Sequence, residues 1–139
     1  MNWLIWSLLS ALFAALTAIL AKLGVASVDA NLATAVRTSV VVVFTWVLAL
    51  ATSQPGGLRS FTGKTWLYLV LSGLATGLSW LCYFHALQVG EASRVAPIDK
   101  LSVVLVIVAA TLFLGERLTW GKAVGALMIA GGAMVVAWE

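Results

Sequence analysis

Three charged residues stand within or at the edge of long apolar runs: Arg37, Asp99 and Lys100. Arg37 lies seven residues inside the apolar run 30–51, which is about 10 Å along a helix. A charge at that depth in a bilayer costs several kcal/mol unless it is paired or reaches water. Three interpretations therefore stay open: the side chain extends to the membrane surface, forms an intramembrane ion pair, or lines an aqueous pathway.

Asp99 and Lys100 begin another apolar run, in the segment RVAPIDKLSVVLV. We expect Pro97 in the first turn of this helix, where its missing N–H costs least, and Asp99 near the positive helix end. Lys100 gains nothing from that dipole, so it needs a partner, a route to the surface or a ligand. Adjacent helix residues project about 100° apart, so the two side chains should not simply face each other. Arg37 or Lys22 is an alternative partner for Asp99, and we predict the polar mouth of a pathway here.

The composition excludes a water-soluble surface. The chain has 139 residues, 63% hydrophobic and 9% charged, and a mean hydropathy of +1.09, whereas soluble domains carry roughly 25% charged residues. Most of its surface should therefore face lipid. The net charge of +3 does not indicate nucleic-acid binding, because the eight basic residues are scattered singly rather than gathered in a stripe. The single cysteine, Cys82, cannot form a disulfide within the chain.

Apolar runs of about 20 residues, the length that crosses a bilayer, occur five times. The expected spans are 3–21, 30–51, 66–89, 95–114 and 120–138. Turn signals separate them, including Pro55-Gly56-Gly57, and Thr119 can cap the last helix. The predicted fold class is an all-α integral membrane protein with five transmembrane helices, forming a single domain over residues 1–139.

Small residues repeat along two of the spans at the spacing of one helix face. Gly73 and Gly77 lie in the third span, and Gly121, Gly125 and Gly132 lie in the fifth. Such small-xxx-small patterns let helix backbones approach closely in lipid, so we expect helix packing or a dimer contact at these positions. The spacing does not decide whether the partner helix belongs to the same chain or to a second copy.

Lysine and arginine are distributed almost evenly between the two sides of the membrane. The cations on the N-terminal side are Arg59, Lys64, Arg117 and Lys122, against Lys22, Arg94 and Lys100 on the other, with Arg37 a possible fourth. Because the bias of these residues sets orientation, a near-equal distribution allows both orientations. Two copies in opposite orientations would form a ten-helix body with the geometry of inverted repeats. We therefore predict dual topology and an antiparallel homodimer.

Four segments resemble the EamA-type members of the drug/metabolite transporter superfamily: FAALTAILAKLGV, NLATAVRTSVVVVF, ALQVGEASRVAPIDKLSVVLV and LFLGERLTWGKAVGALMIAGG. The resemblance covers essentially the whole chain. Members typically carry two five-helix repeats in an inverted arrangement, and this chain resembles one repeat, which would need a partner. The resemblance implies ATP-independent secondary transport, often export, of a small metabolite or drug-like solute across the inner membrane by alternating access.

The resemblance also implies a pathway lined by the first four spans, with the fifth structural or dimer-forming. On that basis the pathway or gate residues are Arg37, Trp80, Tyr83, Asp99 and Lys100. Two other functions remain open: a lipid-linked carrier or flippase, and a non-transporting scaffold subunit of a membrane complex. No nucleophile–base pair, Cys/His metal spacing or phosphate-binding loop indicates an enzyme, a metal site or a cofactor. The expected partners are a small-molecule substrate, the lipid bilayer and a second copy of the chain.

Candidates for a coupling proton site are few: Asp99, Glu91 and His85. None of them is isolated from basic neighbours as a high-pKa carrier acid would be. His85 lies about a turn from the end of its span, and we interpret it as an interfacial residue. We interpret Glu116 as a structural acid at a helix end. Replacement of Arg37 or Asp99 by alanine should therefore abolish transport more readily than replacement of His85.

Overall fold

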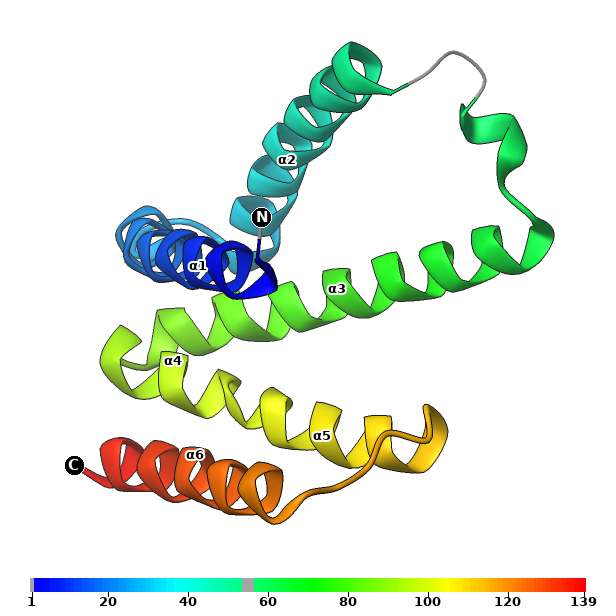
Figure 1. Ribbon diagram of the computed structural model, residues 1–139. Helices are drawn as coiled ribbons and strands as arrows, with labels where there is room; N and C mark the ends of the chain where they lie inside the picture. Colours follow the sequence, from blue (N-terminus) through cyan, green and yellow to red (C-terminus); the bar gives the residue numbers. More distant parts are fainter. Residues whose placement is uncertain (1, 54–56) are drawn as a thin grey trace. The chain divides into compact units, whose positions relative to one another are not determined.

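The computed structural model describes residues 2–53 and 57–139, and every regular element in these ranges is helical (Figure 1). The elements are α1 (Trp3–Val25), α2 (Ala30–Thr52), the 3-10 turn η1 (Gly57–Ser60), α3 (Gly63–Val89), α4 (Ala92–Asp99), α5 (Leu101–Phe113) and α6 (Trp120–Trp138). Within those residues, five stretches are long and apolar enough to cross a membrane, and α4 and α5 together form the fourth. The expected all-helical class with five spans is confirmed, and the chain is a multi-pass membrane protein.

Polar side chains fix the starts of two long helices. The Asp29 side chain accepts a hydrogen bond from the Leu32 N–H at 2.9 Å and so caps α2. Thr119 caps α6, as expected, by accepting from the Lys122 N–H at 3.3 Å. Each cap satisfies a backbone donor that the first turn of a helix leaves without a partner. The turn expected at Pro55-Gly56-Gly57 lies largely outside the described residues.

The fourth span begins earlier than expected and is interrupted. It starts at Ala92, so Pro97 is the sixth residue of α4 and not part of its first turn, and α4 ends at Asp99. The prediction that Pro97 begins this helix was wrong because the residues before it are already helical. Proline lacks the N–H that would bond to the carbonyl four residues earlier, which weakens the helix at this point. The Lys100 N–H donates to the Pro97 carbonyl at 3.1 Å, and the Val103 N–H donates to the Lys100 carbonyl at 3.0 Å.

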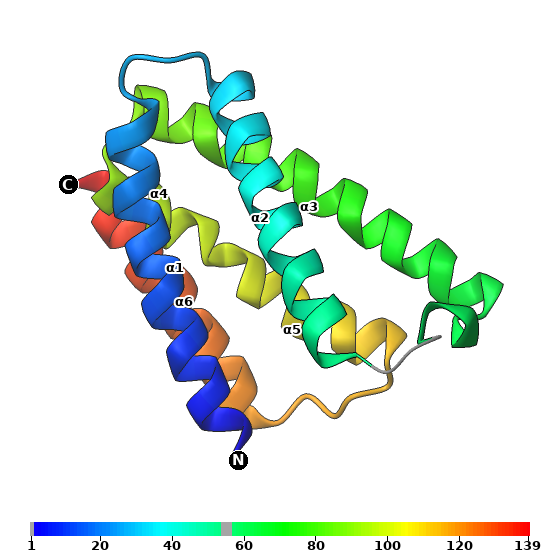
Figure 2. The ribbon, with the colours of Figure 1, turned by 90° about the horizontal axis from the view of Figure 1, so that it is seen from above.

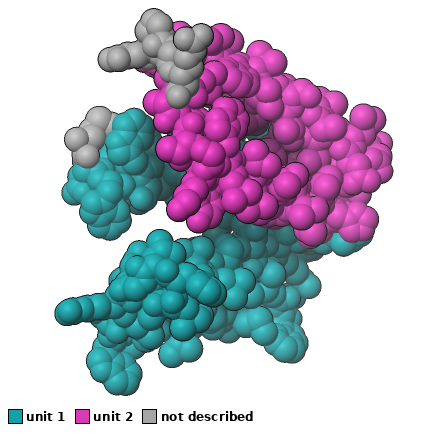
Figure 3. Space-filling view, turned by 90° about the vertical axis from the view of Figure 1, so that its right-hand side faces the viewer, with its two compact units in different colours: residues 1–22, 89–139 teal, residues 23–88 magenta. Residues whose placement is uncertain are grey.

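The chain divides into two compact units, coloured separately in Figure 3. Unit 1 comprises residues 1–22 and 89–139, and unit 2 comprises residues 23–88. Within unit 1, α6 packs against α4 and α5 (Figures 1 and 2). Arg37 therefore belongs to unit 2, whereas Asp99 belongs to unit 1.

Few large side chains are buried within the chain. Val25 and Leu87 are fully buried in unit 2, and α6 buries Ala126 and Ala133. Most large hydrophobic side chains are exposed instead, such as Leu50 at 78%. In a bilayer the lipid tails cover such side chains as well as another helix would, so their exposure here carries no hydrophobic penalty.

Candidate functional site

The guanidinium of Arg37, on α2, contacts an aromatic face of α3. Its Cζ atom lies 4.2 Å from the centroid of the Trp80 ring and 5.5 Å from the centroid of the Phe84 ring. Both distances fall within the roughly 6 Å limit of a cation–π interaction. Tyr83 interacts electrostatically with the same arginine. The structure therefore brings together three of the predicted pathway residues, Arg37, Trp80 and Tyr83.

Phe84 belongs to this cluster but was not predicted as a site residue. It lies four residues after Trp80, so the two rings share one face of α3. Phe84 is only 3% exposed and is the more deeply held of the two rings. The spacing from Trp80 was the available signal in the sequence. It identifies the shared face, but it does not reveal which residue of another helix lies opposite.

The threonines on either side of Arg37 make hydrogen bonds within their own helix. The Thr34 hydroxyl donates to the Ala30 carbonyl and the Thr38 hydroxyl donates to the Thr34 carbonyl, each at 2.7 Å. Their protons are thus used within α2, as is common for threonine in helices. Among the described residues of unit 2, Arg37 forms neither an ion pair nor a hydrogen bond. The guanidinium is held by aromatic rings and not by a carboxylate.

The second predicted charged site lies at the break between α4 and α5. The Lys100 Nζ is 3.1 Å from the Asp99 Oδ2, so the prediction that these neighbours do not face each other was wrong. The backbone of Lys100 stays helical, with φ −71° and ψ −8°, and the pair forms because the long lysine side chain spans the offset between neighbouring residues. The Asp99 side chain is 36% exposed and the Lys100 side chain is 56% exposed. An ion pair this open to solvent contributes about 0–1 kcal/mol to stability, and its role in a pathway stays a prediction.

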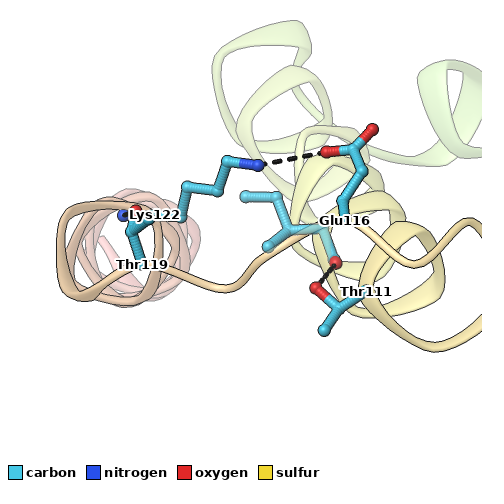
Figure 4. Close-up of polar contacts among 5 residues, drawn as sticks. Thr111, Glu116, Thr119 and Lys122 are labelled. Carbon is cyan, nitrogen blue, oxygen red and sulfur yellow. Dashed lines mark hydrogen bonds and ion pairs between the residues drawn. The ribbon is translucent and has the colours of Figure 1, made fainter.

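Two further ion pairs lie near helix ends. Arg94 pairs with Glu91 at 3.3 Å, beside the start of α4. Figure 4 shows the Lys122 ammonium reaching from α6 to the Glu116 carboxylate, at 3.0 Å, across the segment that joins α5 to α6. Gly115, in the same segment, has a φ of +69°, a conformation that favours glycine. The Glu116–Lys122 pair and Gly115 thus both lie in the connection between α5 and α6.

Two long polar side chains bind backbone carbonyls near the starts and ends of helices. In unit 1, the Lys22 Nζ donates to the Gly90 carbonyl at 2.8 Å. In unit 2, the Gln88 Nε2 donates to the Val28 carbonyl at 2.5 Å. Sequence reasoning did not identify either contact, because both depend on how distant segments meet. No group of three or more His, Cys, Asp or Glu side chains within the described residues could hold a metal ion.

The glycine faces of α3 and α6 have open space beside them. The glycines in question are Gly73, Gly77, Gly121, Gly125 and Gly132. Outside the neighbouring residues and backbone of its own helix, a Cβ atom built on any of them would meet no atom within 4 Å. In α6 the buried positions are Ala126 and Ala133, each one residue beyond a glycine of the other face. Within unit 1, α6 thus buries two alanines and leaves space beside its glycines.

Within the described residues, five stretches are long and apolar enough to cross a membrane, and one of them holds an arginine against aromatic rings. An ionisable residue inside a span often marks the path of a solute or an ion, so these features fit a membrane transporter. Comparison of the sequence with protein families agrees with this class. The chain belongs to the EamA-like transporter family, whose sequence profile matches residues 1–138.

Two relatives illustrate the range of the family. A protein of Sinorhizobium sp., named "Uncharacterized transporter in cobO 3'region", is 50% identical over 136 residues, which are 98% of this chain and 96% of that protein. A protein of Erwinia tasmaniensis, named "Probable 4-amino-4-deoxy-L-arabinose-phosphoundecaprenol flippase subunit ArnF", is 40% identical over 72 residues, which are 50% of this chain and 57% of that protein. No solved structure matches the chain.

Proposed function

We propose that this protein is a secondary active transporter of the inner membrane that exports a small metabolite or drug-like solute by alternating access. The observation that carries the proposal is the Arg37 guanidinium, held on Trp80 and Phe84 without a counter-ion among the described residues of unit 2. An ionisable residue kept inside a span is expensive and commonly marks the path of a solute or ion. Arg37, Trp80 and Tyr83 are its proposed pathway residues, and Asp99 and Lys100 its proposed gate.

The proposed working form is an antiparallel homodimer. Two observations support it: the glycine faces of α3 and α6 have room for a close helix contact, and lysine and arginine are nearly balanced between the two sides of the membrane. A reporter fused after Glu139 should be found on both sides of the membrane. A reporter found on one side only, in cells with normal amounts of protein, contradicts the antiparallel arrangement.

Counterflow in liposomes tests the transport proposal. The purified full chain is reconstituted, the liposomes are loaded with one class of unlabelled metabolite, and uptake of a labelled member of that class is measured with and without a pH gradient. We expect counterflow for one class and its loss in Arg37→Ala. Lys64→Gln, which removes an exposed cation elsewhere on α3, is the matched control and should keep transport. A folded protein that shows no counterflow for any class contradicts the proposal.

A flippase is the second candidate function. The observation that favours it is the 40% identity over 72 residues with a relative named as a flippase subunit. Movement of a labelled polyprenyl-phosphate lipid between leaflets, without counterflow of any soluble solute, would support the flippase instead. If the protein moves neither kind of molecule, the third possibility is a scaffold subunit of a larger membrane complex.

A further inference from the structure

The contacts of Arg37 leave most of its hydrogen-bonding capacity available. An arginine side chain carries five N–H donors in the plane of the guanidinium. The rings of Trp80 and Phe84 attract its positive charge but offer no oxygen acceptor. The flanking hydroxyls of Thr34 and Thr38 donate to carbonyls of α2, and no hydrogen bond joins Arg37 to a described residue.

The acidic residues of the chain are engaged elsewhere or lie far along it. There are five: Asp29, Glu91, Asp99, Glu116 and Glu139. Three of them pair with a lysine or arginine close in sequence. Asp29, the one acid of unit 2, accepts the capping hydrogen bond at the start of α2, eight residues before Arg37. Neither α2 nor α3 contains an acidic residue of its own.

A fixed cation with in-plane donors matches an oxyanion. Carboxylates and phosphates bind arginine through two parallel N–H···O bonds, which are stronger than hydrogen bonds between neutral groups. An aromatic ring behind the guanidinium holds its plane in place, so less side-chain entropy is lost when the anion binds. Such a ligand would also neutralise a charge about 10 Å along the span, where an unpaired cation is costly.

We infer that the transported substrate carries an oxyanion, a carboxylate or a phosphate, which binds the N–H donors of Arg37 while Trp80 holds the guanidinium in place. This assignment rests on the proposed transport function and specifies its substrate class. The oxyanion has two possible sources, a water-soluble solute or the phosphate of a lipid headgroup. Both present the same chemistry to Arg37.

The test measures binding without transport. The full chain, fused to a fluorescent protein and kept in dodecyl maltoside, is heated with increasing concentrations of a small ligand, and the remaining folded fraction is read by size-exclusion chromatography. The oxyanions are phenyl phosphate and benzoate, and their uncharged counterparts are benzyl alcohol and benzamide. A ligand that binds only the folded state raises the unfolding temperature, and the stabilisation grows with the logarithm of one plus the ratio of its concentration to its Kd.

We expect phenyl phosphate or benzoate to stabilise the protein, and the uncharged counterparts to have no effect. Arg37→Gln should raise the apparent Kd by about tenfold or more, because charge-assisted hydrogen bonds are lost. Arg37→Lys, which keeps the charge but not the planar donor set, should weaken binding by a smaller factor. It replaces Arg37→Gln as the test variant if the glutamine variant does not fold. Lys64→Gln has the same change in net charge and should bind like the wild type. Equal stabilisation by charged and uncharged ligands, or equal binding by wild type and Arg37→Gln, overturns the inference.

A parallel arm identifies the source of the oxyanion. The same heating experiment is performed in nanodiscs of dioleoyl phosphatidylcholine that contain either dioleoyl phosphatidic acid or dioleoylglycerol. Stabilisation by phosphatidic acid that depends on Arg37 supports the inference and assigns the phosphate to a lipid. A response to soluble oxyanions alone supports it and assigns the group to a solute. No Arg37-dependent response in either arm overturns it.

The binding and transport results separate the two proposals. Arg37-dependent oxyanion binding in a protein that performs no counterflow keeps the binding site and rejects the transporter. Counterflow of a neutral or cationic solute that persists in Arg37→Gln keeps the transporter and rejects the oxyanion site.

Discussion

The contact between Arg37 and Trp80 should contribute measurably to stability. Its length, 4.2 Å from Cζ to the ring centroid, and the partial burial of both residues place it between exposed and desolvated cation–π interactions. Those extremes contribute about 0.5–1 and about 2 kcal/mol. A double-mutant cycle with Arg37→Met and Trp80→Leu should therefore give a coupling energy of about 1–2 kcal/mol. The 5.5 Å contact between Arg37 and Phe84 lies near the outer distance limit of a cation–π interaction. A double-mutant cycle on this pair should therefore give a coupling energy of about 0.5 kcal/mol or less.

The single variants of this cycle should behave asymmetrically. Trp80→Leu leaves the charge in the span without its principal ring, so it should lower the free energy of unfolding. Arg37→Met removes the same contact but also removes the cost of keeping a cation within the span. The two effects of Arg37→Met oppose each other, and its stability should equal or exceed that of the wild type.

The assay is unfolding by sodium dodecyl sulfate in dodecyl maltoside micelles, followed by far-ultraviolet circular dichroism. A cycle of Arg37→Met with Trp66→Leu is the matched control, because Trp66 lies fourteen residues from Trp80 on α3 and makes an edge-to-face contact with Phe61 instead. Distant pairs are usually additive within about 0.5 kcal/mol. A coupling energy for Trp80 no larger than that for Trp66 would refute the cation–π contact.

Three other predictions concern single positions. Gly115→Ala should lower the free energy of unfolding by about 1–2 kcal/mol, because alanine is strained at a φ of +69°; Gly24→Ala in α1, where a Cβ meets nothing, should instead be neutral or stabilising in the same titration. Asp29→Ala should lower the free energy of unfolding by about 0.5–2 kcal/mol, because the cap on α2 is lost. Asp29→Ser, which can form the same cap, should recover most of that free energy. In counterflow, Asp99→Ala should lose most activity and His85→Ala should keep most, and the reverse order would contradict the proposed gate.

The sequence predicts the spans well because their signal is local. A run of about 20 apolar residues is identified from composition alone, and Thr119 caps α6 through a contact three residues away. The interruption of the fourth span is harder to predict. Pro97 marks a weakness in a helix, but its effect depends on whether the residues before it are already helical, and here α4 starts at Ala92.

The candidate site could be predicted in part. Arg37 was identifiable because a charge within an apolar run is costly wherever the helix packs, whereas Trp80 was proposed because the family resemblance implies that the third span lines the pathway. The contact between them could not be derived, because it depends on the rotation of α2 and α3 about their axes. The pairing of Lys100 with Asp99 was also missed, since the offset between neighbouring residues was considered without the length of the lysine side chain.

The interruption at Lys100 affects how stiff the fourth span is. A continuous helix such as α1 resists bending because each turn is tied to the next by backbone hydrogen bonds. Between Ala92 and Phe113, proline has already removed one of these bonds, and the bonds on either side of Lys100 run to the third residue back instead of the fourth. A change of angle between α4 and α5 therefore breaks fewer hydrogen bonds than the same change within α1. The fourth span should therefore bend more readily at Lys100 than α1 does, and this is the point that carries the Asp99–Lys100 ion pair.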